Sequence, residues 1–129
     1  MSYNLNTLRD KLLCDLRTLN IDVEGFELVL KPFSKTYYGR YSPKNRRITL
    51  YVYSDEQCTK LYRYSQLFET TLHEVVHFIQ WTDPDYVRVK GVMHNAEFYK
   101  IYNRLLSIHK RKRVLKRVIE TPKIRTAVY

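Results

Sequence analysis

The sequence predicts an α+β fold, in which an N-terminal helix and a small antiparallel sheet with a hairpin precede two further helices. Leucines recur at helical spacing near the N-terminus, which indicates an amphipathic helix. Apolar and polar residues then alternate over residues 46–53, as in a half-buried strand, and helical periodicity returns in the second half of the chain. A chain of 129 residues that is 44% hydrophobic has room for one globular core.

Residues 4–20 are expected to form the first helix, with Asn4 or Asn6 as its cap. Its apolar stripe consists of leucines alone: Leu5, Leu8, Leu12, Leu13, Leu16 and Leu19. We interpret it as a helix that docks on the core, because a membrane-surface helix would carry a much more basic polar face.

The sheet is expected to lie between residues 26 and 53. Residues 26–30 alternate as a strand does, and Pro32 limits its continuation. Residues 37–41 and 46–53 flank the segment Ser-Pro-Lys-Asn, which predicts a hairpin, because Pro43 suits a turn corner and Asn tolerates a positive φ. The apolar residues of the second hairpin strand lie on one face: Ile48, Leu50 and Val52.

A His-Glu-x-x-His pattern lies in a helix that is expected to begin near Leu61 or Ser65 and to end near Trp81. The four-residue spacing places His73 and His77 on one face of the helix. Two imidazoles at this spacing can hold one zinc ion, with Glu74 beside the metal as general base for a bound water. The apolar neighbours indicate a buried helix, where these polar groups are costly unless a metal pairs with them.

A catalytic zinc ion needs a third protein ligand and one open position. His94 lies just before a second helix, which is expected over residues 95–109. Asp83 lies six residues after His77, the spacing at which another class of zinc peptidase, the metzincins, places its third ligand. That geometry needs a helix-breaking glycine where this chain has Gln80. Glu97 could bind from the second helix, although a glutamate in a first turn also suits the helix dipole. The residues alone leave all three alternatives open.

The stretch from His73 to Trp81, a loop, and then His-Asn-Ala-Glu-Phe from His94 together resemble the SprT-like zinc metallopeptidases, which include the Spartan proteases. The resemblance implies a minimal zincin-like domain and a zinc metalloendopeptidase that acts on proteins or peptides. It also implies the site residues: Zn²⁺ held by His73, His77 and His94, with Glu74 as the catalytic base. Asn95 stands where the family usually has Gly, and the sequence carries no four-Cys zinc ribbon.

The resemblance also implies a role for the hairpin. In zincins, an edge strand beside the active-site helix receives an extended substrate by strand addition, and backbone pairing makes this binding tolerant of sequence. The alternative is a sheet that only covers the core. Tyr99, Tyr102 and Arg104 are candidates to stabilise a developing oxyanion, and the sequence does not choose among them.

The net charge of +10 is concentrated near the C-terminus. Residues 100–129 contain ten Lys and Arg but a single acid, whereas residues 1–99 contain 13 Lys and Arg and 12 acids. We therefore predict a peptidase domain over residues 1–109 and a basic extension over residues 110–129, which either continues or follows the second ligand helix. His109, at the border, is expected on the helix surface.

The basic extension is expected to contact the phosphates of DNA without reading bases, because clustered cations bind nucleic acid through counterion release. The predicted nucleic-acid-binding residues are all cations: Lys110, Arg111, Lys112, Arg113, Lys116 and Arg117. No apolar run approaches 18 residues, no signal peptide is recognisable, and Cys14 and Cys58 suggest no disulfide framework. These features predict a cytoplasmic protein with no membrane segment.

Three functions are compatible with these observations. The first is a zinc metallopeptidase that hydrolyses peptide bonds, with DNA-associated proteins as one substrate class. The second is a basic nucleic-acid-binding module whose zinc site is structural or vestigial. The third is an interaction protein whose basic helix docks a partner.

Overall fold

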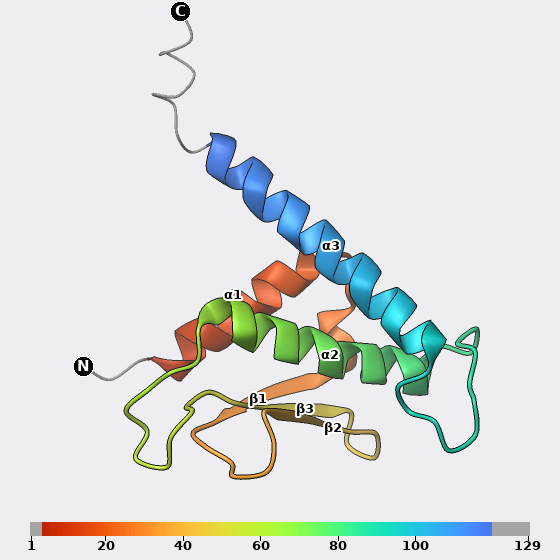
Figure 1. Cartoon of the computed structure of the whole chain (residues 1–129), viewed down its shortest axis with the longest axis horizontal. Helices are drawn as coiled ribbons and strands as arrows, with labels where there is room; N and C mark the ends of the chain where they lie inside the picture. The colour runs from red at the N-terminus through yellow and green to blue at the C-terminus, as the bar shows by residue number, and fades with distance from the viewer. Residues whose placement is uncertain (1–3, 120–129) are drawn as a thin grey trace, which may run out of the picture.

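A computed structural model describes residues 4–119 of the chain, and the side chains of residues 4–115. The fold is α+β, with three α-helices and a small mixed sheet of three strands. Helix α2 (Tyr64–Thr82) covers one face of the sheet, and α1 (Leu5–Arg17) and α3 (Ala96–Ile119) pack against α2 (Figure 1). None of the described helices combines the length and the apolar character needed to cross a membrane.

Helix α1 docks on the core, as its leucine stripe predicts. Its innermost leucines are buried: Leu8, Leu12 and Leu16. Asn4 is the N-cap, and its Oδ1 accepts hydrogen bonds from the backbone N–H groups of Asn6 at 2.9 Å and Thr7 at 3.3 Å. The Tyr64 hydroxyl donates to Asp15 Oδ2 at 2.5 Å, which joins α1 to the first turn of α2.

The sheet contains β1 (Glu27–Lys31), β2 (Gly39–Ser42) and β3 (Arg47–Tyr51), in the order β1-β3-β2. A short 3₁₀ helix, η1 (Val23–Gly25), precedes β1. The predicted hairpin is confirmed, because β2 and β3 are antiparallel, with Ser42 opposite Arg47.

The prediction of an antiparallel sheet is wrong for β1, which pairs with β3 in parallel. The chain leaves β1, forms β2 at the far edge of β3, and returns through the hairpin in the direction of β1. Alternation of apolar residues reports which face of a strand is buried but not the direction of its neighbour, so the sequence pattern could not reveal this. In the turn, the positive φ of 49° belongs to Arg46.

Strand β2 is an edge strand that lies very close to α2. A Cβ atom on Gly39 would lie 2.9 Å from Thr70 Cγ2 and 3.5 Å from Glu74 Cγ. Glycine therefore allows the start of β2 to approach the part of α2 that carries Glu74.

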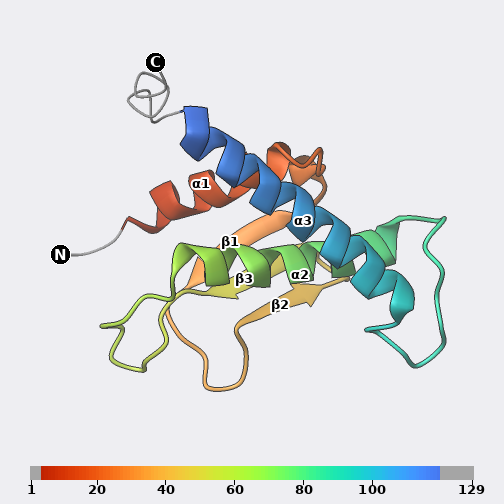
Figure 2. The ribbon, with the colours of Figure 1, turned by 45° about the horizontal axis from the view of Figure 1, so that its top comes forward.

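Helix α3 runs without a break from Ala96 to Ile119, so the predicted boundary between residues 109 and 110 falls inside a helix. Its first turns cross the C-terminal half of α2, and its later turns extend past the sheet and beyond α1 (Figure 2). The Lys112 ammonium donates a hydrogen bond to the carbonyl oxygen of Thr18, which follows α1.

Candidate metal centre

Helix α2 presents the three polar residues of the His-Glu-x-x-His pattern. Its core-facing residues are fully buried: Leu72, Val75 and Val76. Glu74 and His77 are also buried, and His73 is half-buried. The rings of His73 and His77 lie 5.1 Å apart, which is the neighbouring position expected one helical turn along the same face.

His94 reaches the two helical histidines from the loop that precedes α3. Its Nε2 atom lies 3.1 Å from His77 Nε2, and one ligand nitrogen from each of the three histidines lies within 4.8 Å of the others. Nitrogen ligands at 2.0–2.1 Å around a tetrahedral ion are about 3.4 Å apart. The three histidines are therefore close enough to bind a metal ion.

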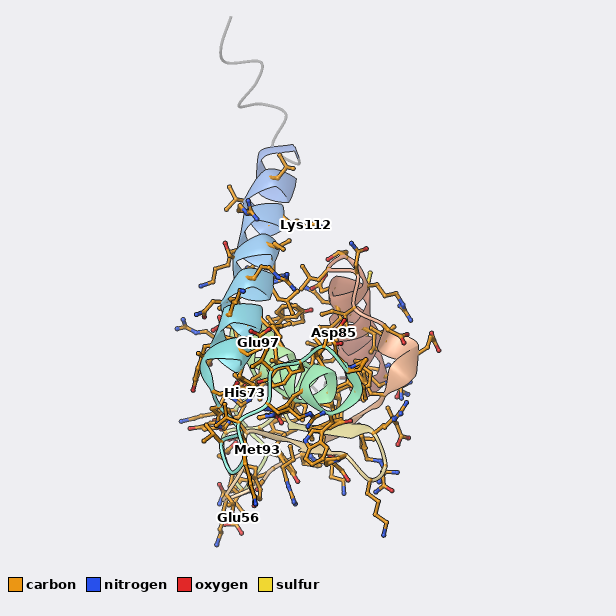
Figure 3. The ribbon with its side chains drawn as sticks, turned by 90° about the vertical axis from the view of Figure 1, so that its right-hand side faces the viewer. Glu56, His73, Asp85, Met93, Glu97 and Lys112 are labelled. Carbon is orange, nitrogen blue, oxygen red and sulfur yellow. The ribbon has the colours of Figure 1, made fainter. Side chains whose placement is uncertain are left out.

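The two other candidate ligands lie outside this cluster. Asp83 follows the end of α2, and its Oδ1 accepts a hydrogen bond from the backbone N–H of Asp85 at 2.9 Å. Glu97 lies in the first turn of α3. Figure 3 views this end of the molecule, with His73 and Glu97 in the same region and Lys112 much further along α3.

The electrostatic environment keeps His94 in the form that binds metals. Partial desolvation lowers the pKa of the His94 imidazole, and His77 and His73 act in the same direction, while the Glu74 carboxylate opposes them. The imidazole is therefore neutral near pH 7, and a neutral ring nitrogen is the one that coordinates a metal. Glu74 Oε2 lies 3.1 Å from His73 Nδ1, so the carboxylate is directly beside the cluster.

Gln80 fixes the orientation of His77. It lies one turn after His77 on α2, is buried, and its Oε1 lies 3.0 Å from His77 Nδ1. An amide oxygen only accepts hydrogen bonds, so Nδ1 is the donor in this contact, and Nε2, which faces His94, is the nitrogen left to bind a metal. The Gln80 amide nitrogen donates to the Met93 carbonyl at 2.7 Å and to the Tyr86 hydroxyl at 3.2 Å. Gln80 thus joins α2 to the loop that carries His94.

Asn95 completes this hydrogen-bond network at the start of α3. Its Oδ1 accepts from the backbone N–H of Phe98 at 3.0 Å, as an N-cap does, and from the Tyr86 hydroxyl at 2.6 Å. Its Nδ2 donates to the Val87 carbonyl at 2.9 Å. Asn95 therefore both caps α3 and holds the preceding loop.

Sequence reasoning missed Gln80 and Tyr86 as partners of the site and treated Asn95 only as a departure from a motif. Two signals were available. Gln80 is a polar residue three positions after His77, next to the apolar residues Phe78, Ile79 and Trp81, and an asparagine just before a predicted helix is a common N-cap. Tyr86 gave no such signal.

Phe98 packs among all three histidines and is fully buried. Its ring centroid lies 4.9 Å from that of His73, 4.7 Å from His77 and 4.9 Å from His94. This ring shields one side of the histidine cluster from water.

The other side of the cluster opens into a cleft of about 380 Å³, which we call the metal-side cleft. Its walls come from β2 and the preceding loop, α2 and α3: Thr36, Tyr37, Tyr38, Gly39, Glu69, Thr70, His73, Glu74 and Tyr102. Of the three oxyanion candidates, only Tyr102 lines this cleft. Burial raises the pKa of the Tyr102 hydroxyl and the Glu69 charge adds to this, so the hydroxyl is protonated and can donate a hydrogen bond.

The predicted nucleic-acid-binding residues divide into two groups. Residues 110–113 are exposed on α3, whereas the side chains of Lys116 and Arg117 lie outside the described ones.

The expectation that His109 lies on the surface is wrong, because its ring is buried and stacks on Phe68 at 3.9 Å. Helix α3 still crosses α2 at this point, so this turn faces the core.

The chain was compared with protein-family models, curated proteins and solved structures, and none of them matches it.

Proposed function

We propose that the protein is a zinc-dependent metallopeptidase with a zincin-like domain of the SprT-like kind. One observation carries the proposal: three imidazoles from α2 and the loop before α3 converge beside a buried glutamate and an open cleft. Three imidazoles with one side free are the donor set of a catalytic zinc site, in which one position is left for water or substrate.

The residues of the cluster fit this ion. His73, His77 and His94 would hold it, and a bound zinc ion supplies Lewis-acid chemistry that activates water and polarises a carbonyl. Glu74 accepts the proton of the attacking water and later delivers it to the leaving amine. Tyr102 donates a hydrogen bond to the oxygen that gains negative charge.

Strand β2 is suited to align an extended peptide. It is an edge strand of the sheet, and Gly39 brings its start against α2 beside Glu74. A peptide that pairs with the free edge of β2 would run along the metal-side cleft, held mainly through backbone hydrogen bonds. Such binding is tolerant of sequence, as an enzyme with many protein substrates requires.

Metal content and hydrolysis of an unfolded protein, measured on the same preparations, test this proposal. Wild type should contain about one zinc per chain and hydrolyse the substrate. Glu74→Gln should keep the zinc and lose at least about a hundredfold in rate, because the general base is gone. His94→Ala should lose both.

Asp83→Ala and Glu97→Ala are the matched controls, because each removes a carboxylate that lies outside the histidine cluster. Both should retain zinc and activity. Full activity in Glu74→Gln, or no zinc in folded wild type after incubation with zinc, would overturn the proposal.

A second candidate function has its own observation. The exposed cations of residues 110–113 form a basic stretch of α3, and Lys112 lies far from His73, which is on α2 (Figure 3). Attached to a peptidase, this stretch would bring the enzyme to proteins bound on DNA; alone, it would make a nucleic-acid-binding module with a structural metal site. Salt-sensitive DNA binding without hydrolysis of any protein, with or without DNA, would favour the module.

A further inference from the structure

A second cleft adjoins the metal-side cleft along α2. It has a volume of about 280 Å³ and is lined by Tyr38, Tyr51, Tyr62, Gln66, Leu67, Glu69 and Thr70. We call it the tyrosine cleft. Tyr38, Glu69 and Thr70 line both clefts, so the two form one continuous depression that leads from Glu74 toward the first turns of α2.

Glu69 is the acidic residue where the two clefts meet. It lies four residues before His73, on the same face of α2, and is half-buried. In the part of the chain that the structure describes, no hydrogen bond or salt bridge joins its carboxylate to another residue. A carboxylate held in a cleft without a counter-ion attracts a positively charged ligand, because pairing compensates its lost hydration.

The walls of the tyrosine cleft also favour a cation. The rings of Tyr38 and Tyr62 lie 5.6 Å apart at 63°, and Tyr51 adds a third ring. Aromatic faces attract ammonium and guanidinium groups and pack against the methylene groups that carry them. Arg40 and Tyr37 already make such a contact nearby, with the guanidinium 4.6 Å from the ring centre.

We propose that the tyrosine cleft binds a cationic nitrogen of the peptide substrate, with Glu69 as its ion-pair partner and the tyrosines around it. This proposal rests on the proposed peptidase function, because the cleft continues the one beside the metal centre. The cation is either the side chain of a lysine or arginine within the peptide or the free N-terminal amine. Both sources share the chemistry of a positively charged nitrogen that donates hydrogen bonds to a carboxylate.

Peptide binding without turnover tests the proposal. The full chain carrying Glu74→Gln, loaded with zinc, is titrated with short peptides labelled at the C-terminus, and fluorescence anisotropy gives Kd. The first peptide is N-acetylated with one central lysine, the second has norleucine instead, and the third has norleucine and a free N-terminus. The peptide whose charged nitrogen pairs with Glu69, either the lysine peptide or the one with a free N-terminus, should bind about tenfold more tightly than the acetylated norleucine peptide.

Removing the charge of Glu69 should abolish this preference. In the same background, Glu69→Gln should bind the three peptides equally, whereas the control Glu97→Gln, which lines neither cleft, should keep the preference. Tyr38→Leu should weaken it about threefold, and this variant cannot disturb the core, since the ring is 65% exposed.

The three peptides distinguish a side-chain cation from an N-terminal amine, and hydrolysis by wild type tests the peptidase function separately from the cation subsite. Tighter binding of the lysine peptide identifies a side-chain subsite, and tighter binding of the third peptide identifies an N-terminal amine subsite. Equal binding of all three, or a preference that survives Glu69→Gln, overturns the proposal. Failure of wild type to hydrolyse any protein would instead overturn the peptidase function and leave the binding preference intact.

Discussion

The two ends of α3 hold their side chains in different ways. At the N-terminal end, Asn95 and Phe98 are buried, and hydrogen bonds or ring contacts connect them to the histidine cluster. Further along, residues 110–115 are exposed, and a hydrogen bond from Lys112 to the Thr18 carbonyl connects this stretch to α1.

This difference matches two kinds of chemistry. Metal coordination requires ligand atoms held to within a few tenths of an ångström, so the residues around them must be packed and hydrogen-bonded. Attraction to phosphate requires only a density of positive charge, and flexible exposed cations provide it. One helix can therefore serve both purposes, because a buried end supplies geometry and an exposed end supplies charge.

Removal of the metal should have the largest effect, and only at the histidine end. Chelation should abolish hydrolysis and lower the thermal unfolding temperature, since a ligand that binds only the folded state stabilises it by about 2.7 kcal/mol at about a hundred times its Kd. DNA binding should be unchanged. Calorimetry measures the unfolding temperature of the chelated sample, and a DNA-binding assay on the same sample measures its DNA affinity. A loss of DNA affinity on chelation would mean that the two regions are coupled.

Substitution of Gln80 should have the next largest effect. Gln80→Leu leaves His77 Nδ1 and the Met93 carbonyl without their partner, so zinc affinity should fall about 10–100-fold. Gln80→Glu separates the two roles, because a carboxylate still accepts from His77 but cannot donate to Met93. Competition with a chromophoric chelator measures the zinc affinity. An unchanged zinc affinity in Gln80→Leu would show that Gln80 does not support the metal centre.

A smaller effect concerns the buried His109, which lies between the two regions. Burial lowers the pKa of its imidazole, and Arg113 and Lys110 act in the same direction, while Asp15 and Glu69 oppose them. The unfolded chain therefore binds a proton more readily than the folded one. The stability that His109 confers is complete above the ordinary histidine pKa and is lost as the pH falls below it.

His109→Phe should remove this part of the acid sensitivity, because a phenyl ring can stack on Phe68 without titrating. It also removes a buried Nε2 atom that has no hydrogen-bond partner. Urea unfolding of metal-free wild type and variant at pH 7 and pH 5 measures the difference. The prediction fails if both proteins lose the same stability between these two pH values.

The smallest effect at the metal centre is expected from the basic stretch. Replacing Lys110, Arg111 and Arg113 with glutamine should leave zinc content and peptide hydrolysis unchanged. The slope of log DNA affinity against log salt should become shallower by about 0.9 for each phosphate that the variant no longer neutralises. An unchanged slope would show that these cations do not bind DNA phosphates, and a loss of zinc would show that the comparison between the two ends is wrong.

The sequence alone predicted the features that depend on neighbours a few residues apart. The leucine stripe predicted α1, the turn residues predicted the β2–β3 hairpin, and the four-residue spacing predicted that His73 and His77 would share a face of α2. Backbone geometry sets these relations locally, since helical and strand periods act over one or two turns.

Only the tertiary structure decided what long-range packing brings together. His94 is 17 residues from His77, and the path of the intervening loop, held by Gln80, brings it into the cluster that excludes Asp83 and Glu97. The parallel pairing of β1, the burial of His109 and the meeting of the two clefts at Glu69 arise in the same way. Local periodicity is the same whichever neighbour an element finally packs against, so these features follow from the packing of the whole chain.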